Sequence, residues 1–249
     1  MNTKLHPKKG QLISTAFTAC FSICLAGNAL AATWGYTKHN GPDTWHNIAP
    51  MCKQGMNQSP IDISETIQSD LNPLEVRYQG KLTNFSNIGH TLQASFVGNN
   101  SVSVDRESFE LLQMHLHTPS ENLLNGKQYP LEAHFVHQNA EGALAVIAVF
   151  YTSGREANEA LDRLIAIIPA AGEQIEMATS ISPTDLLPKN KTFFRFNGSL
   201  TTPPCSEGVR WLVMKNQLAG STAQIERLQK VMGNNNRPVQ PRNARMVLH

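Results

Sequence analysis

Residues 113–136, QMHLHTPSENLLNGKQYPLEAHFV, constrain the fold of this chain more than any other segment. The segment begins with alternating side chains, and successive side chains of an extended strand point to opposite faces. His115 and His117 therefore share one face of a predicted strand. Asn125-Gly126 follows, a dipeptide typical of a two-residue hairpin turn. The pattern predicts two strands that pair through this hairpin.

The second strand, residues 131–138 (LEAHFVHQ), alternates in the same way and carries His134. Pairing of the two strands would bring His134 onto the face of His115 and His117. Three neutral imidazoles on rigid strands form a tetrahedral zinc site with an open fourth position, the catalytic rather than the structural pattern. A His-x-His pair alone would be a weak signal, because a strand histidine is usually structural. The third histidine makes a metal site the better interpretation.

Two further polar residues lie on the same faces as these histidines. Gln113 and Glu132 each precede a histidine by two positions. Each could accept a hydrogen bond from the ring N–H of its neighbouring ligand and so fix the tautomer of that ring. We therefore predict that Gln113 supports His115 and that Glu132 supports His134.

The N-terminus differs from the rest of the chain. It carries three lysines and no acidic residue, and the following residues 11–27 are largely apolar. This is the pattern of a secretory signal peptide. An uncleaved anchor is the weaker interpretation, because a bilayer span needs about 20 apolar residues. We predict a signal peptide over residues 1–31 and one globular domain over residues 32–249.

Composition limits the classes of partner. The chain of 249 residues is 41% hydrophobic and 16% charged, enough for a sizeable core. Without the three lysines of the signal, 18 basic and 19 acidic residues remain, a formal charge of −1. The domain has no basic stripe and no second long apolar run, which argues against a nucleic-acid partner and against membrane association after signal removal. The oligomeric state is left open.

The four cysteines also bear on the compartment. Cys20 and Cys24 would leave with the signal peptide, although a lipoprotein attached through one of them is a weaker alternative. Cys52 and Cys205 then remain as a single pair. In an oxidising compartment such a pair forms a disulfide. We expect an exported protein, periplasmic or secreted, with this disulfide.

Short β-rich runs separated by turn residues dominate the domain and predict a mainly β (α+β) fold. The predicted strands cover residues 74–78, 90–97, 101–105, 108–117, 131–138, 144–152, 192–196 and 208–215. Two helices are predicted, over residues 155–168 and 221–232. The second has Gln224 placed for a capping box and Gly233 at its end.

Six separated motifs, in this order, give the chain its resemblance to a known family. They are Trp34-Gly35-Tyr36, NQSPIDI from Asn57, the His-x-His strand, Glu132-Ala133-His134, SLTTPP from Ser199, and Asn236-Arg237-Pro238 with Gln240-Pro241. Over nearly the whole mature length the chain resembles the α-class carbonic anhydrases. The resemblance implies a large central, mostly antiparallel, twisted sheet with a few peripheral helices. It also implies a zinc lyase that hydrates carbon dioxide reversibly to bicarbonate and a proton through zinc-bound hydroxide.

The same resemblance assigns roles to individual residues. It places zinc on His115, His117 and His134, with Thr201 beside the hydroxide, Glu121 as the partner of Thr201, His90 as proton shuttle and Tyr36 beside the water path. It implies a carbon dioxide pocket formed by Val136, Val146, Leu200, Thr202 and Trp211. These roles agree with elementary chemistry. A threonine hydroxyl has one donor proton, so a hydroxyl that donates to a carboxylate can only accept from hydroxide.

Three other interpretations fit the sequence less well. His115-x-His117-x-x-x-Glu121 also fits the first motif of cupins, but Phe109 stands where that motif has glycine, and no second cupin motif follows. A non-catalytic carbonic anhydrase relative would be expected to lack a ligand histidine. A zinc carrier would be expected to have a His-rich tract. Thr118 and Pro119 depart from the better-known animal members, which have a tryptophan and a glycine at these positions, and neither change touches a proposed ligand.

Overall fold

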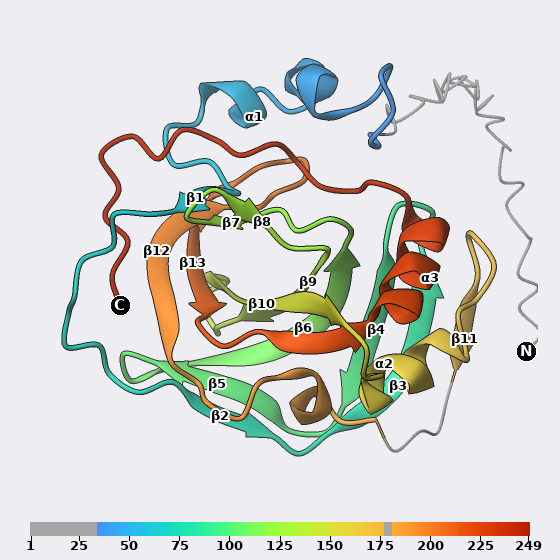
Figure 1. Ribbon diagram of the computed structural model, residues 1–249. Coiled ribbons are helices and arrows are strands. Elements are labelled where there is room, and N and C mark those ends of the chain that lie inside the picture. The colour runs from blue at the N-terminus through green and yellow to red at the C-terminus, as the bar shows by residue number, and fades with distance from the viewer. Residues whose placement is uncertain (1–33, 177–180) are drawn as a thin grey trace, which may run out of the picture. The chain divides into compact units, whose positions relative to one another are not determined.

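The computed structural model describes residues 34–176 and 181–249, which belong to one compact unit (Figure 1). The predicted signal peptide, residues 1–31, lies outside the described residues. Among the helices of the described residues, none combines the length and the apolar character that crossing a bilayer would require.

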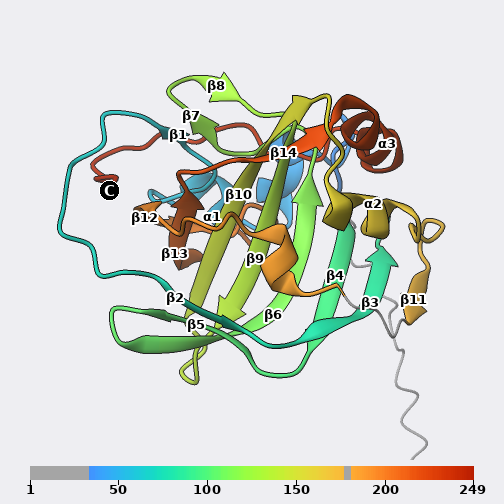
Figure 2. The same cartoon turned by 60° about the horizontal axis from the view of Figure 1, so that its bottom comes forward.

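A mixed sheet of 11 described strands forms the centre of the domain. Its main path runs in the order β11 (Gln174–Glu176), β3 (Lys81–Asn87), β4 (Leu92–Val97), β6 (Glu107–His117), β9 (Leu131–Gln138), β10 (Leu144–Gly154), β13 (Glu207–Met214) and β12 (Phe193–Ser199). Beside this path, β5 (Asn100–Val104) pairs with β6 and with β2 (Glu75–Tyr78), and β14 (Leu218–Ser221) pairs with β10. Strand β10 runs parallel to β13 and β14, whereas the other pairs described in this sheet are antiparallel. The predicted mainly β fold is confirmed, and Figure 2 shows the twist of the sheet.

A small second sheet consists of β1 (Asp62–Ile63), β7 (Leu123–Leu124) and β8 (Lys127–Gln128). Asn125 and Gly126 form its turn, with φ values of 51° and 75°. Both lie in the left-handed region that a two-residue hairpin turn requires. The prediction that this turn returns the chain directly into the strand of His134 is wrong in one respect. The turn closes the small β7–β8 hairpin, and the chain enters β9 only afterwards.

Strand β3 was missed by the sequence analysis. Its pairing with β4 shifts register between Leu82 and Asn84. A bulge of this kind interrupts the period of two on which strand prediction depends. Strands β11 and β14 are too short to give a clear pattern.

The helices of the described residues are few and short. They are α1 (Met51–Gln54), α2 (Glu159–Ile165) and α3 (Thr222–Met232), with 3-10 turns η1 (Pro42–Asn47) and η2 (Pro183–Leu186). Helix α2 is shorter than the predicted 155–168, because the Asn158 side chain accepts a hydrogen bond from Leu161 N (3.1 Å) and so caps its start. The predicted capping box of Ser221 and Gln224 is confirmed at the start of α3.

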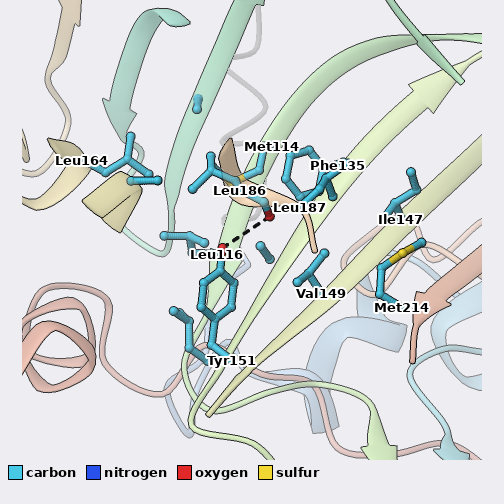
Figure 3. Close-up of a cluster of buried hydrophobic side chains, with 14 of the residues drawn as sticks. Met114, Leu116, Phe135, Ile147, Val149, Tyr151, Leu164, Leu186, Leu187 and Met214 are labelled. Atoms are coloured by element: carbon cyan, nitrogen blue, oxygen red, sulfur yellow. Dashed lines mark hydrogen bonds between the residues drawn. The ribbon is translucent and has the colours of Figure 1, made fainter. Parts of the chain in front are cut away.

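The two faces of the sheet carry different cores. On one face, Met114 and Leu116 of β6 belong to one buried cluster with Phe135 of β9 (Figure 3). Apolar side chains of α2 and η2 complete this cluster. Tyr151 of β10 belongs to the same cluster, and its hydroxyl donates to Leu186 O at 3.5 Å. Full burial of each such side chain contributes about 1.5–3 kcal/mol. This apolar face fixes the strands, so that their opposite face can present polar side chains.

The described N-terminal segment before β1 is packed and has only the short η1 and α1 as regular elements. Trp45 is buried and donates through Nε1 to Gly35 O (3.1 Å) and Asn40 O (2.9 Å). The predicted disulfide between Cys52 and Cys205 is confirmed. It joins this segment to the loop that follows β12.

Candidate metal centre and active site

The three predicted ligands come together on the polar face of β6 and β9. The register places His115 opposite His134, with His117 two residues further along β6. One ring nitrogen from each of the three histidines lies within 4.8 Å of the others. The alternation read from the sequence therefore corresponds to a real convergence of imidazoles.

Two of the rings are oriented by hydrogen bonds on the side away from this centre. His115 Nδ1 lies 2.9 Å from Gln113 Oε1, as expected from the sequence. His117 Nδ1 donates to the main-chain oxygen of Asn235 at 2.8 Å. These contacts leave the Nε2 atoms of both rings for a metal. Asn235 was not found by the sequence analysis, although it directly precedes the Asn236-Arg237-Pro238 motif.

Glu132 stands beside the third ring. Its Oε1 lies 3.1 Å from His134 Nε2, in a bent arrangement that falls short of a hydrogen bond. The buried carboxylate accepts hydrogen bonds from Glu121 N (2.7 Å), Asn122 N (2.9 Å) and Asn122 Nδ2 (2.8 Å). Glu132 thus joins the ring of His134 to the loop of Glu121.

The donor set fits zinc. Burial lowers the pKa of His115, His117 and His134, so the rings are neutral near pH 7, the form that binds a metal. His117 Nε2 is buried and has no hydrogen-bond partner in the described part of the chain. A buried nitrogen without a partner costs free energy. A zinc ion held by the three imidazoles would remove that cost and keep a fourth position open.

Glu121 lies next to this centre and is buried. Its Oε1 accepts from Arg237 N at 2.8 Å, and its Oε2 lies 3.5 Å from His117 Nε2. Burial raises the pKa of Glu121 to about 8, and the hydrogen bond from Arg237 N and the nearby Thr201 hydroxyl oppose that rise. A cation on the three imidazoles would oppose it further. The Thr201 side chain is thus near Glu121, and the direct pairing of the two stays a prediction.

Arg237 is a second residue whose role the sequence did not indicate. Its buried guanidinium donates to Gln58 Oε1 (2.9 Å), Ser59 O (2.8 Å) and Cys52 O (2.7 Å). The main-chain N–H of the same residue holds Glu121. Arg237 thereby connects the N-terminal segment, at Cys52, to the Glu121 carboxylate beside the metal centre.

A pocket of about 180 Å³ extends from His115 and His117 to His90 and Tyr36, and Thr202 lines it as well. The His90 ring lies 6.3 Å from the Tyr36 ring, centroid to centroid. Burial, followed by the charge of His117, lowers the pKa of His90. Burial and then the charge of Glu121 raise the pKa of Tyr36.

An apolar wall adjoins the third ligand. Val146 of β10 stands between Val136 and Trp211 on the neighbouring strands, and Leu200 packs against the same cluster. The Trp211 ring lies 4.9 Å from the His134 ring, centroid to centroid. An apolar surface therefore begins beside the metal ligands.

The domain is mainly β, three neutral imidazoles converge in it, two of them line a pocket, and an apolar wall adjoins the third. This combination defines a zinc enzyme whose donor set leaves a fourth coordination position for a reactant. Comparison with known proteins gives the particular family. The model of the eukaryotic-type carbonic anhydrases matches residues 40–249. The chain belongs to this family.

Several carbonic anhydrases cover nearly the whole chain. The enzyme from Pectobacterium carotovorum is 42% identical over 97% of this chain and 100% of that relative. The α-carbonic anhydrase structure from Photobacterium profundum is 52% identical with a TM-score of 0.85, covering 87% of this chain and 100% of the other. The Thermovibrio ammonificans enzyme, solved with the inhibitor sulfanilamide, is 44% identical with a TM-score of 0.84 over 87% of this chain and 99% of the other. The protein is a zinc-dependent lyase that hydrates carbon dioxide reversibly.

Proposed function

We propose that the groups around the three-histidine centre each serve one step of carbon dioxide hydration. These groups are Thr201, Glu121, His90, Tyr36 and the apolar wall. The observation that carries this proposal is the convergence of His115, His117 and His134 within 4.8 Å at one end of a pocket whose other end His90 lines. Zinc bound there lowers the pKa of a water ligand to about 7 and so supplies hydroxide near neutral pH.

Thr201 would orient the reaction. Its hydroxyl has a single proton, and donation of that proton to the nearby Glu121 carboxylate would use it. The hydroxyl oxygen would then act only as an acceptor and so fix the orientation of the nucleophile that bound zinc supplies. Arg237 N, 2.8 Å from Glu121 Oε1, supports this role because it holds the carboxylate in place.

The apolar wall would hold the substrate. Carbon dioxide is small and has no net dipole, so a surface of Val136, Val146, Leu200 and Trp211 suits it better than a polar surface. Thr202 completes the pocket from the same loop as Thr201. Bicarbonate, which is charged, is held less well by this wall and can leave.

His90 would export the proton that each hydration produces. The ordinary pKa of histidine, about 6.5, is the closest of any side chain to neutral pH. Burial and His117 lower the pKa of His90 from that value, so the ring is neutral near pH 7 and ready to accept a proton. The common pocket of His90 and two metal ligands supports a path through water, and Tyr36 lines that path. We further propose that the protein acts after export, in the periplasm or outside the cell, which the Cys52–Cys205 disulfide supports.

Metal analysis and carbon dioxide hydration kinetics test this function. We expect one zinc per chain. His90→Ala should slow hydration mainly at low buffer concentration, with recovery on addition of imidazole, whereas the exposed His39→Ala should behave as wild type. If the ratio of the His90→Ala rate to the wild-type rate does not change with buffer concentration, the shuttle role alone is refuted. Absence of hydration in zinc-loaded wild-type protein would overturn the whole proposal.

A further inference from the structure

The pairing of β4 with β6 ends before it reaches His90. The paired positions on these strands are Gln93 with His115 and Ala94 with Met114. His90 precedes the first residue of β4. Main-chain pairing between the two strands therefore does not hold the His90 backbone at a set distance from the metal ligands.

Two buried side chains continue the connection where the strand pairing stops. Asn235 Nδ2 donates both to His90 O (2.8 Å) and to Leu116 O (2.9 Å). The Thr91 hydroxyl donates to the same Leu116 oxygen at 2.6 Å and accepts from Leu116 N at 3.3 Å. Leu116 lies between the ligands His115 and His117. We call Asn235 and Thr91 the bracket.

Every polar group of Asn235 is occupied in this arrangement. Its side-chain oxygen accepts from Thr118 N (2.7 Å), its main-chain N–H donates to Thr118 O (3.1 Å), and its main-chain oxygen accepts from His117 Nδ1 (2.8 Å). The residue is 1% exposed. The Asn235 side chain thus contacts the backbone of His90, and the main-chain carbonyl of Asn235 contacts the metal ligand His117.

We infer that Asn235 and Thr91 are positioning residues for proton export, which act by fixing the backbone of His90 relative to the ligand strand. This inference rests on the proposed shuttle role of His90. Proton transfer through water depends steeply on the placement of the accepting ring. The attack on carbon dioxide takes place at the metal centre itself, so the bracket affects it less.

Two variants separate the side-chain bracket from the metal contact. Asn235→Ala removes the three side-chain hydrogen bonds and keeps the main-chain carbonyl that orients His117. Thr91→Val keeps the shape of the side chain and removes only the hydroxyl. Asn234→Ala is the matched control, because Asn234 is exposed and its side chain accepts a hydrogen bond from Gln229 Nε2 at 3.3 Å.

In each bracket variant we expect kcat at low buffer concentration to fall about five-fold, with kcat/KM nearly unchanged and with rescue by imidazole. Zinc content should stay at the wild-type level. NMR of the histidine rings in the metal-free variants should show a changed His90 signal and an unchanged His137 signal. Asn234→Ala should match wild type in all three measurements.

Equal losses in kcat and kcat/KM, or unchanged kinetics in both bracket variants, would overturn the inference. An unaltered His90 ring signal would overturn it as well. His90→Ala measured alongside separates two kinds of failure. If His90→Ala shows the buffer dependence and the bracket variants do not, only the bracket fails. If His90→Ala does not show it, the shuttle proposal fails and the bracket fails with it.

Discussion

The metal ligands and the residues proposed to orient the reaction are held in different ways. His115, His117 and His134 project from β6 and β9, whose backbones are paired and whose opposite face is packed in the apolar core. Glu121 and Thr201 lie in connections outside those strands. The main-chain N–H of Arg237 holds Glu121, and the Cys52–Cys205 disulfide holds the loop that carries Thr201. The comparison teaches that metal binding should survive damage to the loops, whereas catalysis should not.

The largest effect is expected from loss of a ligand. His134→Ala should remove most of the zinc and reduce hydration by several orders of magnitude, because two imidazoles cannot complete the site. Zinc content by atomic absorption and the hydration rate check this. His39→Ala is the control, and full zinc occupancy in His134→Ala would contradict the strand-borne site.

The next effect concerns the loops alone. The Cys52–Cys205 bridge spans 153 residues, and on the chain-entropy model closure of such a loop is worth about 5 kcal/mol, an upper value. Reduction, or the double change to serine, should lower the melting temperature. Zinc should stay bound at moderate temperature, since β6 and β9 are not touched.

Melting curves with and without reductant, with zinc measured in parallel, test this expectation. Activity should fall before zinc is lost, because Cys205 follows Thr201 by four positions and Arg237 contacts Cys52 O. Identical melting curves for the oxidised and reduced forms would contradict a stabilising role. Simultaneous loss of zinc and activity would remove the distinction between strands and loops.

The same distinction explains what the sequence could predict. The histidines of β6 and β9 were visible because alternation is a local property of a strand. The hydrogen bonds of Asn235 and Arg237 join residues more than 100 positions apart, such as His117 and Asn235. No local sequence pattern predicts such contacts. Roles for Glu121 and Thr201 came only from the family resemblance. Turn chemistry located the Asn125-Gly126 hairpin but did not specify which strands it joins.

A third prediction separates catalysis from metal binding inside the loops. Thr201→Val keeps the size of the side chain and removes the hydroxyl proposed to donate to Glu121. Hydration should fall by about 10²-fold while zinc stays bound, because orientation is lost and the ligands are not. Thr202→Val, from the same loop, should have a much smaller effect. Equal losses in the two variants would contradict a specific role for Thr201.

The smallest effect concerns the stability of the strands at low pH. It tests whether His137, on the apolar face of β9, makes the folded protein sensitive to acid. His137 is fully buried, accepts from the Tyr78 hydroxyl at 2.6 Å and donates through Nδ1 to Ala145 O at 3.3 Å. Burial lowers the pKa of His137 to about 4, whereas the unfolded chain has the ordinary value of about 6.5.

Between these two values the unfolded state binds a proton that the folded state does not. The free energy of unfolding should therefore fall as pH decreases from about 6.5 to about 4, by at most about 1.4 kcal/mol per pH unit from this group. Urea unfolding of wild type and His137→Gln at pH 7 and pH 5 isolates this contribution, because the ligand histidines titrate in both proteins. The variant should be less stable at pH 7 and should lose less stability on acidification. Equal losses of stability in the two proteins would show that the buried ring of His137 does not make β9 sensitive to acid.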